Sequence, residues 1–126
     1  MKSFEELECY KHGRELRREI STFCKSLPRE EKYRLKDQII RSSRSITANI
    51  AEGFGRYHHQ ENIQFCRISR GSLTETIEHF ITALDEDYLS AVQYDEIRKQ
   101  ADLTLKILNG YIAYLQRCSS GGVPEM

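Results

Sequence analysis

Apolar residues recur along most of this chain at alternating steps of three and four, which is the period of one face of an α-helix. Four such runs predict helices over residues 4–26, 29–52, 59–86 and 91–117. No segment shows the strict alternation of a half-buried strand. Four helices with short connections predict an all-α fold, an up-down-up-down antiparallel four-helix bundle. We expect this bundle to span residues 1–117 and to be followed by a disordered tail at 118–126.

Each predicted helix has one face that we expect to form the core. In the first two helices the residues of this face are Cys9, Gly13, Leu16, Ile20, Phe23 and Leu27, then Leu35, Ile39, Ser43, Ile46 and Ile50. In the last two helices they are Ile63, Cys66, Arg70, Leu73, Ile77, Phe80 and Leu84, then Tyr94, Ile97, Ala101, Leu105, Leu108, Ile112 and Leu115. These faces contain a single charged residue, Arg70.

Capping and proline signals mark the predicted helix starts. Ser3 with Glu6, and Ser90 with Gln93, have the spacing of a capping box. Pro28 suits the first turn of the second helix, where a missing N–H costs nothing. These signals agree with helices that begin near residues 4, 29 and 91.

Glycines and acidic residues mark two of the helix ends. The run at 53–55 (GFG) predicts that the second helix stops there, with a glycine in the left-handed conformation. The run at 85–87 (DED) puts negative charge at the end of the third helix, where the helix dipole disfavours it. We therefore expect a bend or a short loop at these acidic residues.

Composition and charge exclude several classes of protein. The 126 residues suffice for one domain with a buried core. Since 19 Lys and Arg balance 19 Asp and Glu, the chain is not a globally basic nucleic-acid binder. No apolar run approaches the roughly 20 residues of a membrane span, and the charged N-terminus is unlike a signal peptide. We expect a cytoplasmic protein without membrane association.

The cysteines favour reduced thiols. Cys9, Cys24, Cys66 and Cys118 are far apart, with no C-x-x-C and no histidine at zinc-site spacing. Two disulfides are arithmetically allowed, but a bundle of this length does not need them. We expect four free thiols, with at least Cys9 and Cys66 as small core residues.

No sequence pattern indicates catalysis. The Glu-x-x-His motifs of di-iron bundles are absent, and the i,i+4 spacing of Glu75 and His79 predicts a surface pair. There is no G-x-S-x-G motif, glycine-rich phosphate loop or Walker-type Lys-Ser/Thr pair. We therefore predict a protein that is not an enzyme, with no catalytic residues, metal, cofactor or small-molecule substrate. An enzyme would require a site built between subunits.

Positive charge is concentrated in the first half of the chain. Residues 1–56 contain 13 Lys and Arg against 9 Asp and Glu, whereas residues 57–126 contain 6 against 10. The candidate nucleic-acid-binding residues are Lys32, Arg34, Arg41, Arg44 and Arg56. Outward arginines on one helix can follow a phosphate backbone. The alternative is a solvated face whose charge is compensated by Asp37.

Arg70 lies on a predicted core face, where an uncompensated charge is costly. Folding the third helix back on the second brings Arg70 level with several serines, and Gly71 would allow close approach. We predict a structural polar layer of Arg70, Ser43, Ser45, Asn49 and Glu52. The alternatives are that the guanidinium reaches solvent at the bundle rim or lines an oligomer channel.

Apolar residues outside the predicted core faces indicate a second buried surface. They are Ile40, Ala51, Phe65, Ile68, Leu103 and Ile107. One bundle cannot bury all of them, so we expect a homo-oligomer in which another subunit covers part of this set.

Two stretches resemble a known family. Residues 38–56 (QIIRSSRSITANIAEGFGR) are similar to the signature of bacterial four-helix-bundle proteins first noted in intervening sequences of the 23S rRNA gene. Phe65 and residues 67–75 (RISRGSLTE) resemble a second element of that family. Looser similarity runs from about Phe4 to Leu115. One departure is Gly13, where the family more often has alanine, which favours helix more strongly.

The resemblance implies four-helix bundles that assemble as homopentamers, and it brings no catalytic residues. One related branch, the accessory variability determinants of diversity-generating retroelements, binds a reverse transcriptase and its template RNA through a basic surface. We predict a non-enzymatic homo-oligomer that binds RNA or a nucleoprotein partner, with a retroelement reverse transcriptase as a candidate partner. The alternative is a structural or protein-interaction module without nucleic-acid affinity.

Overall fold

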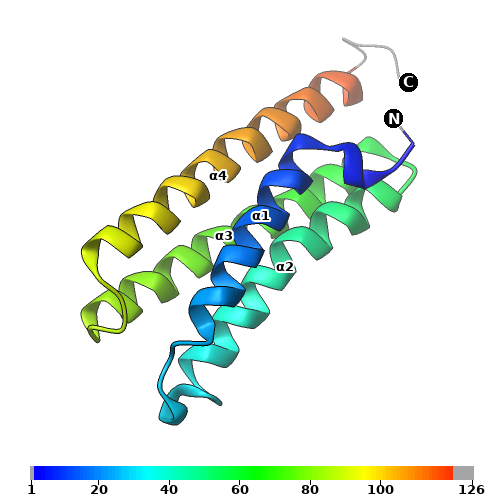
Figure 1. The fold of residues 1–126 in the computed structure, drawn as a ribbon. Helices are drawn as coiled ribbons and strands as arrows, with labels where there is room; N and C mark the ends of the chain where they lie inside the picture. Colours follow the sequence, from blue (N-terminus) through cyan, green and yellow to red (C-terminus); the bar gives the residue numbers. More distant parts are fainter. Residues whose placement is uncertain (1, 121–126) are drawn as a thin grey trace.

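The computed structural model describes residues 2–120, in which every regular element is a helix and there is no strand. Its elements are η1 (Phe4–Glu6), α1 (Glu8–Cys24), η2 (Arg29–Glu31), α2 (Leu35–Gly55), α3 (His59–Asp85) and α4 (Ala91–Ser119). Each α-helix packs against its two neighbours, and successive helices run antiparallel (Figure 1). The α1–α2 and α3–α4 connections lie at one end, and the α2–α3 connection lies at the other. This arrangement confirms the four-helix bundle.

The first two α-helices start later than predicted. The Ser3 hydroxyl accepts a hydrogen bond from the Glu5 N–H (3.2 Å) and caps the short 3-10 helix η1. The predicted capping box is therefore wrong, and α1 begins only at Glu8. Pro28 precedes the second 3-10 helix, η2, and α2 begins at Leu35.

The α2 helix continues through the glycines at which it is predicted to stop. Neither Gly53 nor Gly55 has a left-handed φ, and α2 ends because Arg56 adopts an extended backbone (φ −81°, ψ 145°). Gly53 serves close packing instead. A Cβ atom there would lie 2.6 Å from Oδ1 of Asn62 and 2.9 Å from Cβ of Phe65, both on α3.

The connection between α3 and α4 agrees with the prediction. The α3 helix ends at Asp85, and Asp87 takes a left-handed φ of 60°, a conformation that Asp tolerates better than most residues. Ser90 and Gln93 then form a complete capping box at the start of α4.

The C-terminal end of α4 lies beyond its predicted position. The helix includes the buried Cys118 and extends through Ser119. The prediction of a disordered tail from residue 118 is therefore wrong for residues 118 and 119. Residues 121–126 of the predicted tail lie outside the described residues.

The buried faces of α1 and α2 match the prediction, whereas the buried face of α3 is rotated about the helix axis relative to the predicted one. Every predicted core residue of the first two helices is buried. On α3 the buried residues include Ser69 and Thr76, whereas the predicted Arg70 and Ile77 are only half-buried. On α4, Ala101, Leu108, Ile112 and Leu115 are buried, and Tyr94, Ile97 and Leu105 are half-buried. The face that α3 turns toward α2 is thus lined by small polar residues.

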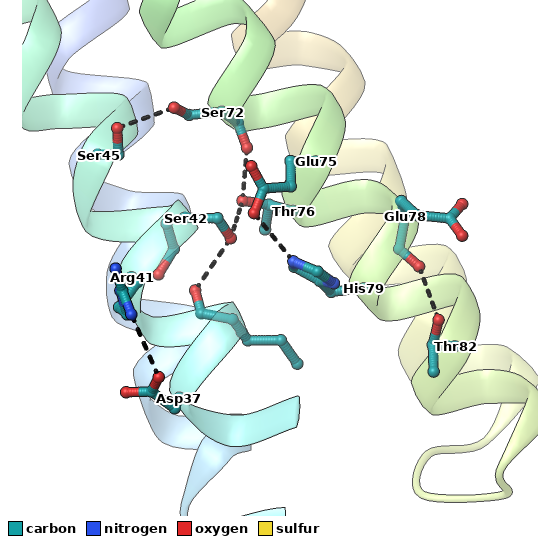
Figure 2. Close-up of polar contacts among 12 residues, drawn as sticks. Asp37, Arg41, Ser42, Ser45, Ser72, Glu75, Thr76, Glu78, His79 and Thr82 are labelled. Atoms are coloured by element: carbon teal, nitrogen blue, oxygen red, sulfur yellow. Dashed lines mark hydrogen bonds and ion pairs between the residues drawn. The ribbon is translucent and has the colours of Figure 1, made fainter. Parts of the chain in front are cut away.

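Hydroxyl groups connect α2 with α3 (Figure 2). The Ser45 and Ser72 hydroxyls lie 2.8 Å apart, as do the hydroxyls of Ser42 and Thr76. The Ser69 hydroxyl donates to the main-chain oxygen of Ile46 at 2.7 Å. Small side chains let the two helix backbones approach closely, and the buried hydroxyls are satisfied across the contact.

All four cysteines are free and buried, which confirms the predicted thiols. Burial raises the pKa of Cys9 to about 12 and that of Cys66 to about 11. These thiols stay protonated near neutral pH and fill space in the core. Within residues 2–120, no helix has the length and apolarity required to cross a membrane.

A side-chain hydrogen bond links the α1–α2 connection to the α3–α4 connection at one end of the bundle. The Tyr88 hydroxyl donates to Oε2 of Glu31 at 2.6 Å, and the Leu35 N–H donates to Oε1 at 3.3 Å. The Tyr88 bond is the larger cause that holds the pKa of Glu31 below its ordinary value, and the same bond raises the pKa of Tyr88 to about 12. The ionised carboxylate is therefore the form that the fold stabilises.

We expect the Tyr88–Glu31 hydrogen bond to stabilise the protein at neutral pH, and we expect this stabilisation to be lost in acid. Since the folded-state pKa of Glu31 is depressed, its contribution is present above the unfolded pKa and disappears as the pH falls through the folded one. Tyr88→Phe should therefore lower the melting temperature at pH 7 but hardly change it in acid, where Glu31 is protonated. Circular-dichroism melts from pH 3 to 8 measure this. A pH-independent difference would contradict it.

Candidate nucleic-acid interface

Arginines gather on the adjoining outward faces of α1 and α2. We define the basic surface as Arg14, Arg17 and Arg18 on α1 with Arg34, Arg41 and Arg44 on or beside α2. All are exposed except Arg17, which is half-buried. The arginines on α1 follow i, i+3 and i+4 spacing, so they share one side of that helix.

Arg17 joins the two halves of the basic surface. Its Nη1 donates to Oγ1 of Thr47 on α2 at 2.8 Å, and the Thr47 hydroxyl lies 3.3 Å from the main-chain oxygen of Arg44. Gly13 is buried one turn from Arg17, and a Cβ there would lie 3.2 Å from Cγ2 of Thr47. The close approach of α1 and α2 therefore brings Arg17 beside Arg44.

The predicted residues Lys32, Arg34, Arg41 and Arg44 are all exposed. Arg41 and Asp37 form an ion pair at 3.7 Å, with 80% of the Arg41 side chain still accessible (Figure 2). The Lys32 ammonium lies 5.3 Å from the Tyr33 ring centroid. Exposed ion pairs such as Arg41–Asp37 contribute little to stability. Asp37 therefore lowers the local positive charge but leaves Arg41 accessible to solvent.

Arg56 does not belong to this surface. It lies at the opposite end of α2 from Arg34, about 30 Å along the helix. Its guanidinium pairs with Glu52 (3.2 Å) and Glu61 (3.7 Å) and lies 4.9 Å from the Phe65 ring centroid. Two carboxylates thus compensate the charge that the sequence pattern assigns to nucleic-acid binding.

The five residues of the predicted polar layer do not all lie together. Asn49 Nδ2 donates to the Ser45 hydroxyl at 2.9 Å, beside the contact with Ser72. Ser43 is buried, but its hydroxyl donates to the main-chain oxygen of Ile40 in its own helix. Ser45 and Asn49 thus belong to the α2–α3 contact, whereas Ser43 does not.

Arg70 and Glu52 lie outside that layer. Arg70 Nη1 donates to Oδ1 of Asn109 on α4 at 2.9 Å, because its side of α3 faces away from α2. A Cβ at the neighbouring Gly71 would meet nothing within 4 Å, so this glycine permits no close helix approach. Glu52 is exposed and pairs with Arg56.

Negative charge collects on the other flank of α1, toward α4. Burial raises the pKa of Glu19, and the nearby carboxylates of Glu15 and Glu96 raise it further. Like charges are therefore close together there. Glu15 also shares a surface pocket with Arg14 and Arg18, so an acidic residue borders the basic surface on this side.

The sequence pattern missed the α1 half of the basic surface. Arg14, Arg17 and Arg18 are visible as a cluster at helical spacing beside the apolar face of α1. That spacing could have placed them on one side of the helix. It could not have shown that this side adjoins Arg44.

No group of three or more His, Cys, Asp or Glu side chains within residues 2–120 is arranged to hold a metal ion. Glu75 and His79 form the predicted i,i+4 pair, with Oε2 and Nε2 3.1 Å apart (Figure 2). This pair lies on α3.

Of the apolar residues predicted outside the core, Ile68 and Leu103 are the most accessible, with 47% and 41% of their surface exposed. Ile40, Ala51, Phe65 and Ile107 are half-buried within the single chain. Phe65 is covered in part by Arg56.

Comparisons with known proteins agree with the sequence resemblance. The family model described as 23S rRNA-intervening sequence protein matches residues 5–110. A crystal structure from Bacteroides thetaiotaomicron, described as a protein of unknown function from the S23 ribosomal protein family, is 26% identical in sequence. The similarity has a TM-score of 0.77 and covers 82% of this chain and 97% of that one. A search of curated proteins gives no match.

Proposed function

Because this chain belongs to the family of 23S rRNA-intervening sequence proteins, we propose that it is a non-enzymatic RNA-binding bundle. The RNA would lie on the basic surface of α1 and α2. Support for this proposal comes from six arginines on α1 and on or beside α2, five of them exposed, of which Arg41 pairs with Asp37. Arginine is well suited to phosphate contacts because its planar guanidinium donates in pairs.

We propose a homo-oligomeric state as well, with five subunits as the family resemblance implies. Support comes from the exposed Ile68 and Leu103 side chains, which a neighbouring subunit would remove from water. Oligomerisation would also repeat the basic surface and multiply its contacts with a long RNA. The retroelement role, as accessory subunit to a reverse transcriptase, rests on the resemblance alone.

The second candidate function is a protein-interaction module without nucleic-acid affinity. The observation in its favour is charge compensation. Arg41 pairs with Asp37, and Arg56 pairs with Glu52 and Glu61. In this alternative, the remaining arginines would be exposed to solvent and would bind no partner.

Fluorescence anisotropy of a labelled RNA hairpin, titrated across a salt series, distinguishes the two functions. We expect the affinity of the wild-type oligomer to fall steeply with salt because bound phosphates release counterions. The combined variant Arg14→Ala, Arg41→Ala and Arg44→Ala should reduce the slope of log K against log salt by about three, one for each lost contact. Arg17 is kept in this variant because it also bonds to Thr47.

The matched control removes the same charge elsewhere, through Arg67→Ala, Lys99→Ala and Lys106→Ala on the exposed faces of α3 and α4. We expect this control to bind nearly as tightly as the wild type. An equal loss of RNA affinity in both triple variants would show that net charge, and not the basic surface, determines binding. Absence of binding at low salt by the assembled wild-type protein would overturn the proposal and leave the interaction module.

A further inference from the structure

A cavity of about 1050 Å³ opens at the end of the bundle that carries the α2–α3 connection. The α1 helix begins at Glu8, so the C-terminal half of α4 is not covered along its whole length. The walls come from the start of α1, the end of α2, the α2–α3 connection and α4. The cavity is as large as the pockets that hold small organic ligands.

Aromatic side chains form much of the cavity wall. Tyr111 and Tyr114 project from α4 with their rings nearly parallel, 16° apart, and their centroids 6.4 Å from each other. Phe54 at the end of α2 and Tyr57 in the following connection border the opening. Tyr57 is 94% exposed, so its ring is accessible to a ligand at the opening.

The floor of the cavity offers a hydrogen-bond donor. Asn62 is buried, and its Nδ2 donates to the Tyr111 hydroxyl oxygen at 3.0 Å. With that oxygen accepting, the hydroxyl hydrogen of Tyr111 is oriented away from Asn62. Burial raises the pKa of Tyr111 to about 12, so the phenol remains a neutral donor.

Two charged groups of the cavity wall are paired with residues outside it. Arg56 at the rim is compensated by Glu52 and Glu61. Glu8, also in the wall, pairs with Lys11 at 3.2 Å, and the protonated Cys9 thiol is no metal ligand near neutral pH. Lys2, His58 and His59 line the cavity as well. A flat heterocycle with polar edges fits a wall that combines aromatic rings with these polar groups.

We propose that this cavity binds a nucleobase, which stacks on the tyrosine rings and accepts a hydrogen bond from Tyr111. The base can come from a free nucleoside or from an unpaired position in RNA, and the RNA source rests on the proposed function. Arg14 lies about 8 Å along α1 from Cys9, and Arg44 lies about 15 Å along α2 from Phe54. An RNA strand on the basic surface therefore reaches the cavity within a few nucleotides.

The RNA source is tested with two hairpins that differ only in one unpaired, bulged adenosine. We expect the wild-type protein to bind the bulged hairpin about tenfold more tightly, the typical effect of stacking one base on an aromatic side chain. Tyr57→Ala and Tyr114→Leu should each remove most of this preference. Tyr33→Ala is the matched control, because Tyr33 is 84% exposed but lies outside the cavity. It should retain the preference.

The nucleoside source is tested by titrating adenosine to millimolar concentration while recording tyrosine-ring NMR signals. We expect shifts of the Tyr57, Tyr111 and Tyr114 signals and none for Tyr33. Adenosine binding without RNA binding would refute the RNA function and leave the nucleobase site. RNA binding without a bulge preference and without adenosine shifts would overturn the nucleobase site and leave the RNA function. A bulge preference that survives both cavity variants would also overturn it.

Discussion

Replacing Gly53 with alanine should lower the free energy of unfolding by about 2 to 3 kcal/mol, as overpacking of a tight helix contact does. The added methyl would lie 2.6 Å from Oδ1 of Asn62 and 3.1 Å from its main-chain oxygen. Asn62 cannot turn aside without cost, because its side chain bonds to Tyr111 and accepts from the Cys66 thiol. The higher helix propensity of alanine, about 1 kcal/mol, offsets only part of this strain.

Gly71→Ala is the matched control for this prediction. Gly71 lies within α3, and a Cβ there would meet nothing within 4 Å. The same chemical change should therefore stabilise the protein by about 0.5 to 1 kcal/mol. Urea unfolding followed by circular dichroism at one protein concentration measures both variants. If Gly53→Ala stabilised the protein as Gly71→Ala does, Gly53 would not be at a close contact.

Replacing Ser69 with leucine should destabilise the bundle by about 3 kcal/mol, through overpacking and a lost hydrogen bond together. Ser69 is fully buried, and its hydroxyl donates to the main-chain oxygen of Ile46 at 2.7 Å. The larger side chain would have to push the α2 backbone away. Ser69→Ala removes only the hydrogen bond and should cost about 1 kcal/mol.

Arg70→Met provides the contrast at the next position. Arg70 is half-buried and bonds to Asn109 at the protein surface, so we expect an effect within about 0.5 kcal/mol. Chemical unfolding measures the loss of stability in each of the three variants. It thereby compares the side of α3 that carries Ser69 with the side that carries Arg70. A larger loss for Arg70→Met than for Ser69→Leu would restore Arg70 to a structural polar layer.

Arg70 and Ser69 show where prediction from sequence stops. The period of α3 selects a broad face, with Arg70 and Ile77 near its centre and Ser69 and Thr76 at one edge. Apolar character favoured Ile77, but the close α2–α3 contact requires small side chains, which Ser69 and Ser72 supply. The rotation of α3 therefore follows from its packing against α2, a relation between two segments far apart in the chain.

The candidate site shows the same division. Outward arginines on α2 follow from the helical period, and Arg34, Arg41 and Arg44 are exposed as expected. Whether a charge stays uncompensated depends on its neighbours. Glu61 reaches Arg56 only because the chain turns back between α2 and α3.

The hydrophobic pattern was sufficient to predict four helices, their order and the buried faces of α1 and α2, because burial of one apolar face is what makes each helix stable. Only the tertiary structure shows that Gly53 permits contact instead of ending a helix, that Arg17 meets Thr47, and that Arg56 is neutralised. These features depend on how each helix is rotated against its neighbours. Helical period assigns residues to a face, but packing and hydrogen bonding between helices select which neighbour that face meets.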